Sequence, residues 1–352
     1  MKKSRRENAK KILRRTGIWI LIFVFMVGYS AVRRQKDTEE ASGITIGLLV
    51  STPSNDFMRA LQDGAEVAAR EHGVQLYVET AYNLEIQLSQ VRSVLARGVD
   101  ALVIWPYDGD AVASVIEEAN EQNVPVFTFD VKAKGCDVTG QISTDNHMIG
   151  ETAAHTMAGF LYQKNGAYQG KIALLSGPFR MTSHQDRVEA FMQVMETEYP
   201  EIQILVQKRM EGSEKVIDVV STWAGMYGGQ LDGIYCASDY LTASVLTALR
   251  QKNQLFPVGD PDHLILLGTD AFPAVVEAIR ENLVDGVVAQ NAVQIGREAM
   301  EAAWEYLEEG QLPEKQRYIP LMVITTENID SEEVKEFGIW SDEYRKEAKD
   351  GE

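Results

Sequence analysis

The stretch Ile44–Gly73 reads ITIGLLVSTPSNDFMRALQDGAEVAAREHG and contains the pattern that decides the fold. Its first part, Ile44–Val50, is an apolar run with the length and composition of a buried strand. A turn at Ser51–Asn55 follows, and apolar residues then recur with helical spacing across Asp56–His72 before Gly73 ends the helix. A buried strand followed by an amphipathic helix is the repeating unit of a parallel sheet that is covered by helices.

The same alternation of strand and helix continues along the chain and restarts after Asp145. It predicts an α/β protein with two doubly wound parallel sheets of similar size, each forming one lobe. The further strands are expected at residues 75–80, 101–104, 125–129, 171–175, 202–207, 233–236, 264–267, 286–290 and 318–324, and the further helices at 84–97, 110–122, 148–162, 183–198, 213–226, 241–251, 274–281 and 292–309.

Polar and aromatic residues follow these strands, at the edge where open α/β sheets bind ligands. Carboxylate, amide and guanidinium groups suit a hydroxyl-rich ligand, because each hydroxyl both donates and accepts, and aromatic rings cover the apolar face of a sugar. Helix capping remains an alternative for several of the Asp and Asn residues, a surface ion pair for Arg187 and a core position for Trp105. The residues are Asn55, Phe57, Trp105, Asp108, Asp130, Arg187, Ser238, Asp239, Asp270 and Gln290.

The charge distribution divides the chain into a basic start and an acidic remainder. Residues 1–15 contain eight basic side chains and one acidic side chain, and the other residues contain 26 basic and 51 acidic ones, a net charge of −25. A surface of this sign repels phosphate backbones, so we expect no nucleic-acid partner for the main body.

An uncharged apolar segment, TGIWILIFVFMVGYSAV, occupies residues 16–32. Its length is at the short end of what spans a bilayer, and the stronger basic cluster precedes it, so residues 1–15 are expected in the cytoplasm. Residues 33–43 form a polar linker to a body outside the membrane. We expect one retained transmembrane helix, although a cleavable signal peptide has the same charge order and would release a secreted form.

Motifs of common enzymes are missing from the sequence. It contains no Gly-x-Ser-x-Gly elbow, no His-Glu-x-x-His and no phosphate-binding glycine loop with lysine. His147, His155 and His184 stand apart from any nucleophile, and surface or capping roles are expected for them. Cys136 and Cys236 are too few for a metal cluster. We therefore expect a binding protein, without cofactor or metal, and not an enzyme.

The chain from Ile44 to about Thr325 resembles the ribose-type periplasmic sugar-binding proteins. That family has two lobes joined by a three-segment hinge, and the resemblance places the crossings near residues 143–146, 290–291 and 324–325. It implies an N-terminal lobe of residues 44–145 and 291–324, a C-terminal lobe of 146–290 and 325–340, and a charged tail of 341–352. The strongest matches are Ile44–Gly64, RGVDALVIWPYDGDA at 97–111, PVFTFD at 125–130, STDN at 143–146, DRVEAF at 186–191, LGTD at 267–270 and AQNAVQIG at 289–296.

The resemblance also implies the sugar site. Four positions depart from the family: Met58 replaces a stacking aromatic, Trp105 and Ser238 replace asparagines, and Val131 replaces an arginine. The loss of the arginine and of the two amides removes hydrogen-bond donors, which predicts a deoxy, less polar or otherwise different ligand from ribose. The implied contacts are Asn55, Phe57, Met58, Trp105, Asp130, Val131, Arg187, Ser238, Asp270 and Gln290.

The expected function is the capture of a small sugar or sugar-like ligand between two closing lobes by a monomeric body. The expected partner is the membrane permease of an ABC-type importer, and the alternative is a sensory receptor that signals to a membrane histidine kinase. A sugar-responsive repressor would carry a DNA-binding helix-turn-helix where this chain has its apolar segment.

Overall fold

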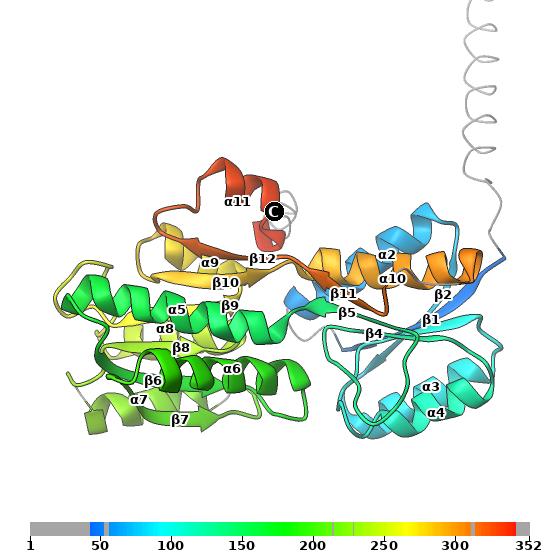
Figure 1. Cartoon of the computed structure of the whole chain (residues 1–352), viewed down its shortest axis with the longest axis horizontal. Coiled ribbons are helices and arrows are strands. Elements are labelled where there is room, and N and C mark those ends of the chain that lie inside the picture. The colour runs from blue at the N-terminus through cyan, green and yellow to red at the C-terminus, as the bar shows by residue number, and fades with distance from the viewer. Residues whose placement is uncertain (1–42, 53–55, 213–214, 228, 311–313, 343–352) are drawn as a thin grey trace, which may run out of the picture.

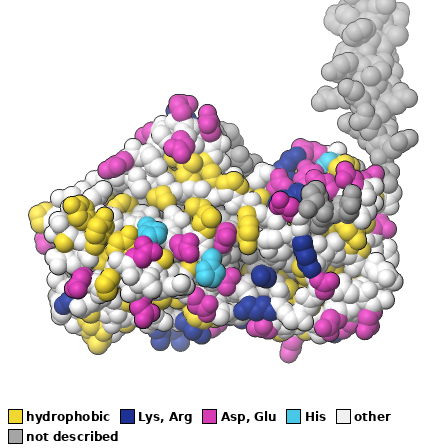
Figure 2. All heavy atoms as spheres, in the orientation of Figure 1, with side chains coloured by type: hydrophobic (Ala, Val, Ile, Leu, Met, Phe, Trp, Pro, Cys, Tyr) yellow, Lys and Arg dark blue, Asp and Glu magenta, His cyan; other side chains and the backbone are white. Residues whose placement is uncertain are grey.

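The protein forms two α/β lobes that lie side by side (Figure 1), which confirms the predicted fold class of the body. Acidic side chains are spread over both lobes on the face in Figure 2, and several basic ones lie where the lobes meet. The computed structural model describes residues 43–52, 56–212, 215–227, 229–310 and 314–342.

The predicted transmembrane segment at residues 16–32 lies outside the described residues, as do the basic start and most of the linker. Within the described part of the chain, no helix combines the length and the apolar character needed to cross a bilayer.

The first lobe contains a six-stranded, wholly parallel sheet with the order β11-β5-β4-β3-β1-β2. Helices α2 and α10 cover one face, and α3 and α4 cover the other. The strands are β1 (Thr45–Ser51), β2 (Gln75–Ala81), β3 (Ala101–Ile104), β4 (Val126–Phe129), β5 (Gly140–Thr144) and β11 (Gln316–Ile319), and the helices are α2 (Asp56–Glu71), α3 (Leu84–Leu95), α4 (Ala113–Glu121) and α10 (Ala292–Glu309).

Strand β1 shows why the sheet is covered on both faces. Ile46, Leu48 and Val50 belong to the core beneath α2 and α10, whereas Leu49 belongs to the core beneath α3 and α4. Because side chains alternate along a strand, an unbroken apolar run supplies both cores.

Two glycines allow α2 and α10 to pack at backbone contact. A side chain on Gly64 would overlap the carbonyl group of Val293, and one on Gly296 would overlap that of Leu61. This packing fixes α2 on the sheet, and with it the first turn of the helix, which carries Phe57 and Met58.

The second lobe repeats the arrangement with the order β12-β10-β9-β8-β6-β7, in which only β12 is antiparallel to its neighbour. Helices α5 and α6 cover one face, and α7, α8 and α9 cover the other. The strands are β6 (Gly170–Ser176), β7 (Ile202–Arg209), β8 (Gly233–Cys236), β9 (Ile265–Asp270), β10 (Gly286–Gln290) and β12 (Leu321–Thr325), and the helices are α5 (Asn146–Asn165), α6 (Thr182–Glu198), α7 (Val216–Tyr227), α8 (Asp239–Gln251), α9 (Pro273–Arg280) and α11 (Glu332–Phe337).

The chain passes between the lobes three times, at Asp145, at Asn291 and at Pro320. The third crossing corrects two predictions, namely a single strand over residues 318–324 and a lobe boundary after residue 324. Strand β11 pairs with β5 in the first lobe, and β12 pairs with β10 in the second. Pro320 separates them because proline lacks the N–H that would continue a ladder.

Candidate functional site

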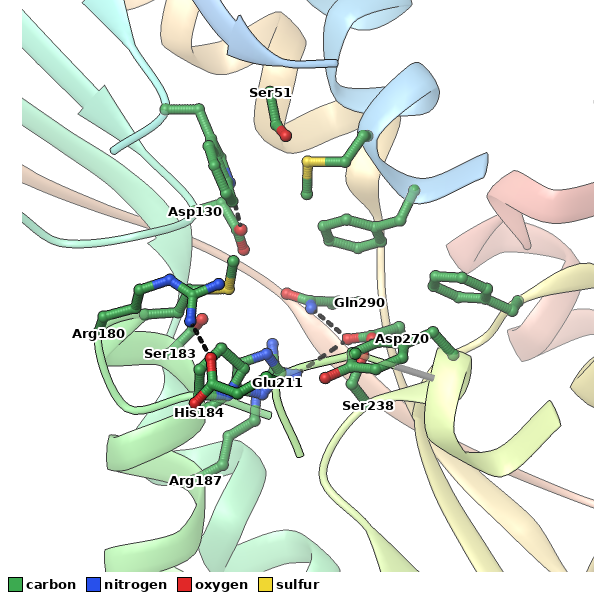
Figure 3. Close-up of a pocket in the computed structure, with 18 residues that line it drawn as sticks. Ser51, Asp130, Arg180, Ser183, His184, Arg187, Glu211, Ser238, Asp270 and Gln290 are labelled. Carbon is green, nitrogen blue, oxygen red and sulfur yellow. Dashed lines mark hydrogen bonds and ion pairs between the residues drawn. The ribbon is translucent and has the colours of Figure 1, made fainter. Parts of the chain in front are cut away.

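A cavity of about 340 Å³ lies between the lobes, at the carboxyl ends of the strands of both sheets. In Figure 3, Asp130 projects from one side of the cavity, and Arg187, Asp270 and Gln290 lie on the other. Eight of the ten predicted contacts line it: Phe57, Met58, Trp105, Asp130, Arg187, Ser238, Asp270 and Gln290.

The other two predicted contacts have different positions. Val131 follows Asp130 and is fully buried, but it is not part of the cavity lining. Asn55 lies outside the described residues.

Asp270, at the end of β9, is the centre of the polar wall. Its Oδ1 accepts hydrogen bonds from Arg187 Nη1 at 3.1 Å and from Gln290 Nε2 at 2.6 Å, and its Oδ2 accepts one from Ser238 Oγ at 2.6 Å. Arg187 and Asp270 therefore form an ion pair whose side chains are only 3% and 5% exposed. Removing either partner would be strongly destabilising, because it would leave an uncompensated buried charge.

Arg187 is in turn held by groups of its own lobe. Its Nε donates to Asn146 Oδ1 and its Nη1 donates to the carbonyl of Ala237, both at 2.8 Å. The predicted alternative, a surface ion pair with a neighbouring acid, is wrong because Arg187 is 2% exposed.

The backbone at the end of β9 is strained. Asp270 has φ of 107° and Ala271 has φ of 71°, and each such residue costs on the order of 1–3 kcal/mol. Asp239, fully buried at the start of α8, stabilises this turn: its carboxylate accepts from the backbone N–H groups of Thr269, Ala271 and Phe272 at 2.8–3.0 Å. Asp239 thus supports the turn. This role accounts for an aspartate after a strand whose side chain does not line the cavity.

Asp130, at the end of β4, is the acidic group of the opposite wall. It also has a left-handed backbone, with φ of 59°, and its Oδ2 accepts a hydrogen bond from Trp105 Nε1 at 2.9 Å. Burial raises the pKa of Asp130, which Arg187 and the Trp105 hydrogen bond partly offset. The Asp130 carboxylate accepts a hydrogen bond from one side-chain donor, whereas the Asp270 carboxylate accepts from three.

Apolar side chains from both lobes complete the lining. Phe57 and Met58 come from the first turn of α2, and Phe272 comes from the segment before α9. Phe57 stacks on Phe272 with ring centroids 6.2 Å apart, so the lobes touch beside the cavity.

A second contact between the lobes consists of hydrogen bonds. Gly109 N donates to the carbonyl of Arg180, and Lys132 N donates to Thr182 Oγ1, both at 2.9 Å. Together with the aromatic contact, these bonds show that the structure is a closed arrangement of the lobes.

His184 is a lining residue for which the sequence analysis predicted a surface or capping role, and that prediction is wrong. It is 6% exposed, and burial, followed by the charges of Arg187 and Arg180, lowers its pKa to about 3. The imidazole is therefore neutral at ordinary pH, and its Nδ1 is buried without a hydrogen-bond partner. The sequence does contain a signal for this position: His184 lies three residues before Arg187 on α6, which places both on the same face of the helix. His147 and His155 are exposed, as predicted.

Other lining residues were also not identified from sequence. Arg180 pairs with Glu211 at 2.6 Å and lies over the ring of Tyr107, 5.4 Å from its centroid. Asp108 makes a turn, because its Oδ1 accepts from the N–H groups of Asp110 and Ala111. Asp108 is thus a turn residue and does not cap the next helix, because the N-cap of α4 is Val112.

The chain is similar to known proteins along most of its length. The family model described as the periplasmic binding protein domain matches residues 46–312. The ribose import binding protein RbsB of Escherichia coli is 27% identical over 261 residues, which cover 74% of this chain and 83% of that protein. Ribose import binding proteins and a xylitol-binding protein among its relatives are binding proteins, not enzymes, by their names.

Two solved structures share the fold. A carbohydrate transporter solute binding protein from Agrobacterium radiobacter, in complex with D-arabinose, has a TM-score of 0.77 at 18% identity and covers 85% of this chain and 99% of its own. An ABC transporter solute binding protein from Agrobacterium vitis with bound D-fucose has a TM-score of 0.74 at 24% identity, with coverage of 83% and 98%. Because the family model spans most of the sequence, this chain belongs to the periplasmic binding protein family.

Proposed function

We propose that this protein is an extracytoplasmic, membrane-anchored receptor that captures a small sugar between its two lobes for an ABC-type importer. The observation that carries the proposal is the cavity itself, with one buried aspartate from each lobe and an apolar lining between them. Carboxylates accept from sugar hydroxyls, and aromatic rings cover the apolar face of a sugar ring. The relatives that bind ribose, arabinose and fucose support a ligand of this class.

The lining favours a ring that presents more apolar surface than ribose does, such as a 6-deoxy sugar, which keeps as many hydroxyl groups as ribose and adds a methyl group. Met58 and Trp105 place apolar surface on the first lobe, and the Trp105 N–H is used by Asp130. Val131 is buried and has no side-chain hydrogen-bonding group where the resembling family has an arginine. The methyl group of such a sugar would pack against these apolar side chains and would need no hydrogen-bond partner.

Thermal unfolding of the full-length chain in mild detergent tests the proposal. The panel contains D-ribose, D-arabinose and D-fucose, with mannitol at equal concentration as the control for solvent effects. A sugar that binds only the folded state must raise the unfolding midpoint, by an amount that grows with its concentration. D-fucose is expected to give the largest shift and mannitol none; no shift with any sugar would contradict a sugar receptor.

The apolar segment at residues 16–32 leaves a second partner open, since no cysteine stands directly after it to carry a lipid anchor. As a sensory receptor, the protein would contact a membrane histidine kinase through its closed lobes. Uptake of radiolabelled D-fucose by cells with and without the chain distinguishes the importer component from the sensor. Lost uptake supports the importer, whereas unchanged uptake with a lost transcriptional response supports the sensor.

A further inference from the structure

The C-terminal segment Ser331–Asp342, which contains α11, packs onto the second lobe next to β12 (Figure 1). Val334 and Ile339 are buried in the core, and Asp342 forms an ion pair with Arg280 of α9, with hydrogen bonds of 2.8 and 3.1 Å. The segment is thus attached to the second lobe and moves with it.

Trp340 of this segment reaches the backbone of the polar wall. The indole is 2% exposed, and its Nε1 donates to the main-chain carbonyl of Asp270 at 2.8 Å. The N–H of the same peptide group belongs to Ala271 and donates to Asp239 Oδ2, also at 2.8 Å. One peptide group is therefore held at both ends, between two residues that both have positive φ.

The ring of Trp340 also contacts the first lobe. Its centroid lies 5.9 Å from that of Phe57 and 5.7 Å from that of Phe272, with edge-to-face angles of 81° and 85°. Phe57 belongs to α2, so this contact joins the lobes and is broken when they separate. Edge-to-face aromatic pairs are favourable beyond the area that they bury.

We propose that Trp340 is a positioning residue that holds the Asp270 peptide in its strained conformation and stabilises the closed arrangement of the lobes through Phe57. The proposal deepens the proposed function and rests on it for its effect on sugar affinity. The C-terminal segment is then part of the binding machinery, through a residue that does not line the cavity.

Two substitutions separate the two roles. Trp340→Phe removes the N–H donor and keeps an aromatic ring, whereas Trp340→Ala also removes the contact with Phe57. Trp304→Phe and Trp304→Ala are the matched controls, because Trp304 stacks on His72 in the first lobe with centroids 3.9 Å apart and does not line the cavity.

Two readouts need no sugar. Hydrogen exchange of the full-length chain reports the Ala271 N–H, and Trp340→Phe is expected to speed it about tenfold, since a peptide fixed at one end opens more easily. Spin-label distances between Tyr82→Cys and Met226→Cys, in a Cys136→Ser background, report closure; both sites are exposed and lie in different lobes. Trp340→Ala is expected to shift this distribution to longer distances.

The third readout is the dissociation constant for D-fucose. Trp340→Phe is expected to raise it about threefold and Trp340→Ala about tenfold, mainly through faster dissociation. Exchange at Ala271 and a distance distribution that match the Trp304 controls would overturn the proposal, whatever the sugar result. If the wild type binds no sugar of the panel, the proposed function fails, and the two sugar-free readouts still decide the role of Trp340.

Discussion

The two walls of the cavity differ although the two sheets that form them have matching strand orders. Each wall has an aspartate at a strand end with a left-handed backbone, Asp130 in the first lobe and Asp270 in the second. Asp270 is held by three side-chain donors, whereas Asp130 has one, from Trp105. The second lobe thus has its polar groups preorganised, and the first supplies mainly apolar cover.

This difference assigns separate tasks to the lobes. Preorganised donors and acceptors select the pattern of ligand hydroxyls, because an unmatched buried group costs about 1–3 kcal/mol. An apolar wall contributes area and excludes water when the lobes close. The substitutions below test whether the walls differ in this way.

The largest effect is expected for Asp270→Ala. Arg187 would keep its charge in a buried site without its ionic partner, which lowers the free energy of unfolding by about 3–5 kcal/mol and abolishes measurable sugar binding. Urea unfolding and calorimetric titration with D-fucose measure the two losses. Asp137→Ala is the control, because Asp137 is 85% exposed beside Lys315, where ion pairs contribute about 0–1 kcal/mol. If Asp270→Ala and Asp137→Ala had equal unfolding free energies, Asp270 would not be a preorganised partner of Arg187. The second wall would then not differ from the first in this respect.

The next effect is expected for Asp130→Asn, which keeps an acceptor for Trp105 and removes the charge. Sugar affinity should fall about tenfold to a hundredfold, because hydrogen bonds to charged groups are worth about 1.5–3 kcal/mol. Without sugar, the same substitution should raise the free energy of unfolding instead of weakening the protein. The pKa of Asp130 lies above its ordinary value of 3.8, so the folded state binds this proton more tightly than the unfolded state does.

The sign of the pH dependence follows from this shift. The contribution of Asp130 favours folding below pH 3.8 and is lost as the pH rises through its folded pKa. Asparagine does not titrate, so the variant should gain stability over the wild type as the pH increases from about 4 to 7. Urea unfolding across this range measures the gap, and a gap that stays constant with pH would contradict a raised pKa.

Much of the fold could be predicted from sequence because the decisive patterns are local. Apolar runs and helical spacing located most strands and helices and both lobes. Strand β5 was missed because its sequence, GQIST, has a single aliphatic residue, and its burial comes from α10 and from its position between β4 and β11. The crossing at Pro320 was misplaced since apolar residues continue on both sides of it.

The site could be predicted only in part. Residues that directly end strands, such as Asp130 and Asp270, reach the cavity because the sheet edge determines their place. His184 and Trp340 were not recognised, because burial of a helix face and docking of a distant segment depend on tertiary packing. Val131 shows the converse error, since a neighbour of a site residue points into the core instead.

A smaller effect is expected for Trp105→Phe, which keeps a ring on the apolar wall and removes the donor to Asp130. Affinity for D-fucose should fall about threefold to tenfold, in line with one buried hydrogen bond. The Trp105 hydrogen bond lowers the pKa of Asp130, so its loss should raise that pKa further and move the acid limb of binding to higher pH. Titrations at several pH values measure both changes, and an unmoved acid limb would argue against the coupling.

The smallest effect is expected for Met58→Phe, which restores the stacking aromatic that is usual in ribose-type relatives. Met58 lines the cavity beside Phe57 on the wall that supplies apolar cover. A phenyl ring would cover more of the apolar face of the sugar than the methionine chain does, so affinity for D-fucose should improve roughly twofold to tenfold, with little change in unfolding without sugar. Met226→Phe, at an exposed position of α7, is the control. Weaker binding by Met58→Phe would mean that this wall selects the ligand by shape, so that its methionine provides room for the ring and not only cover.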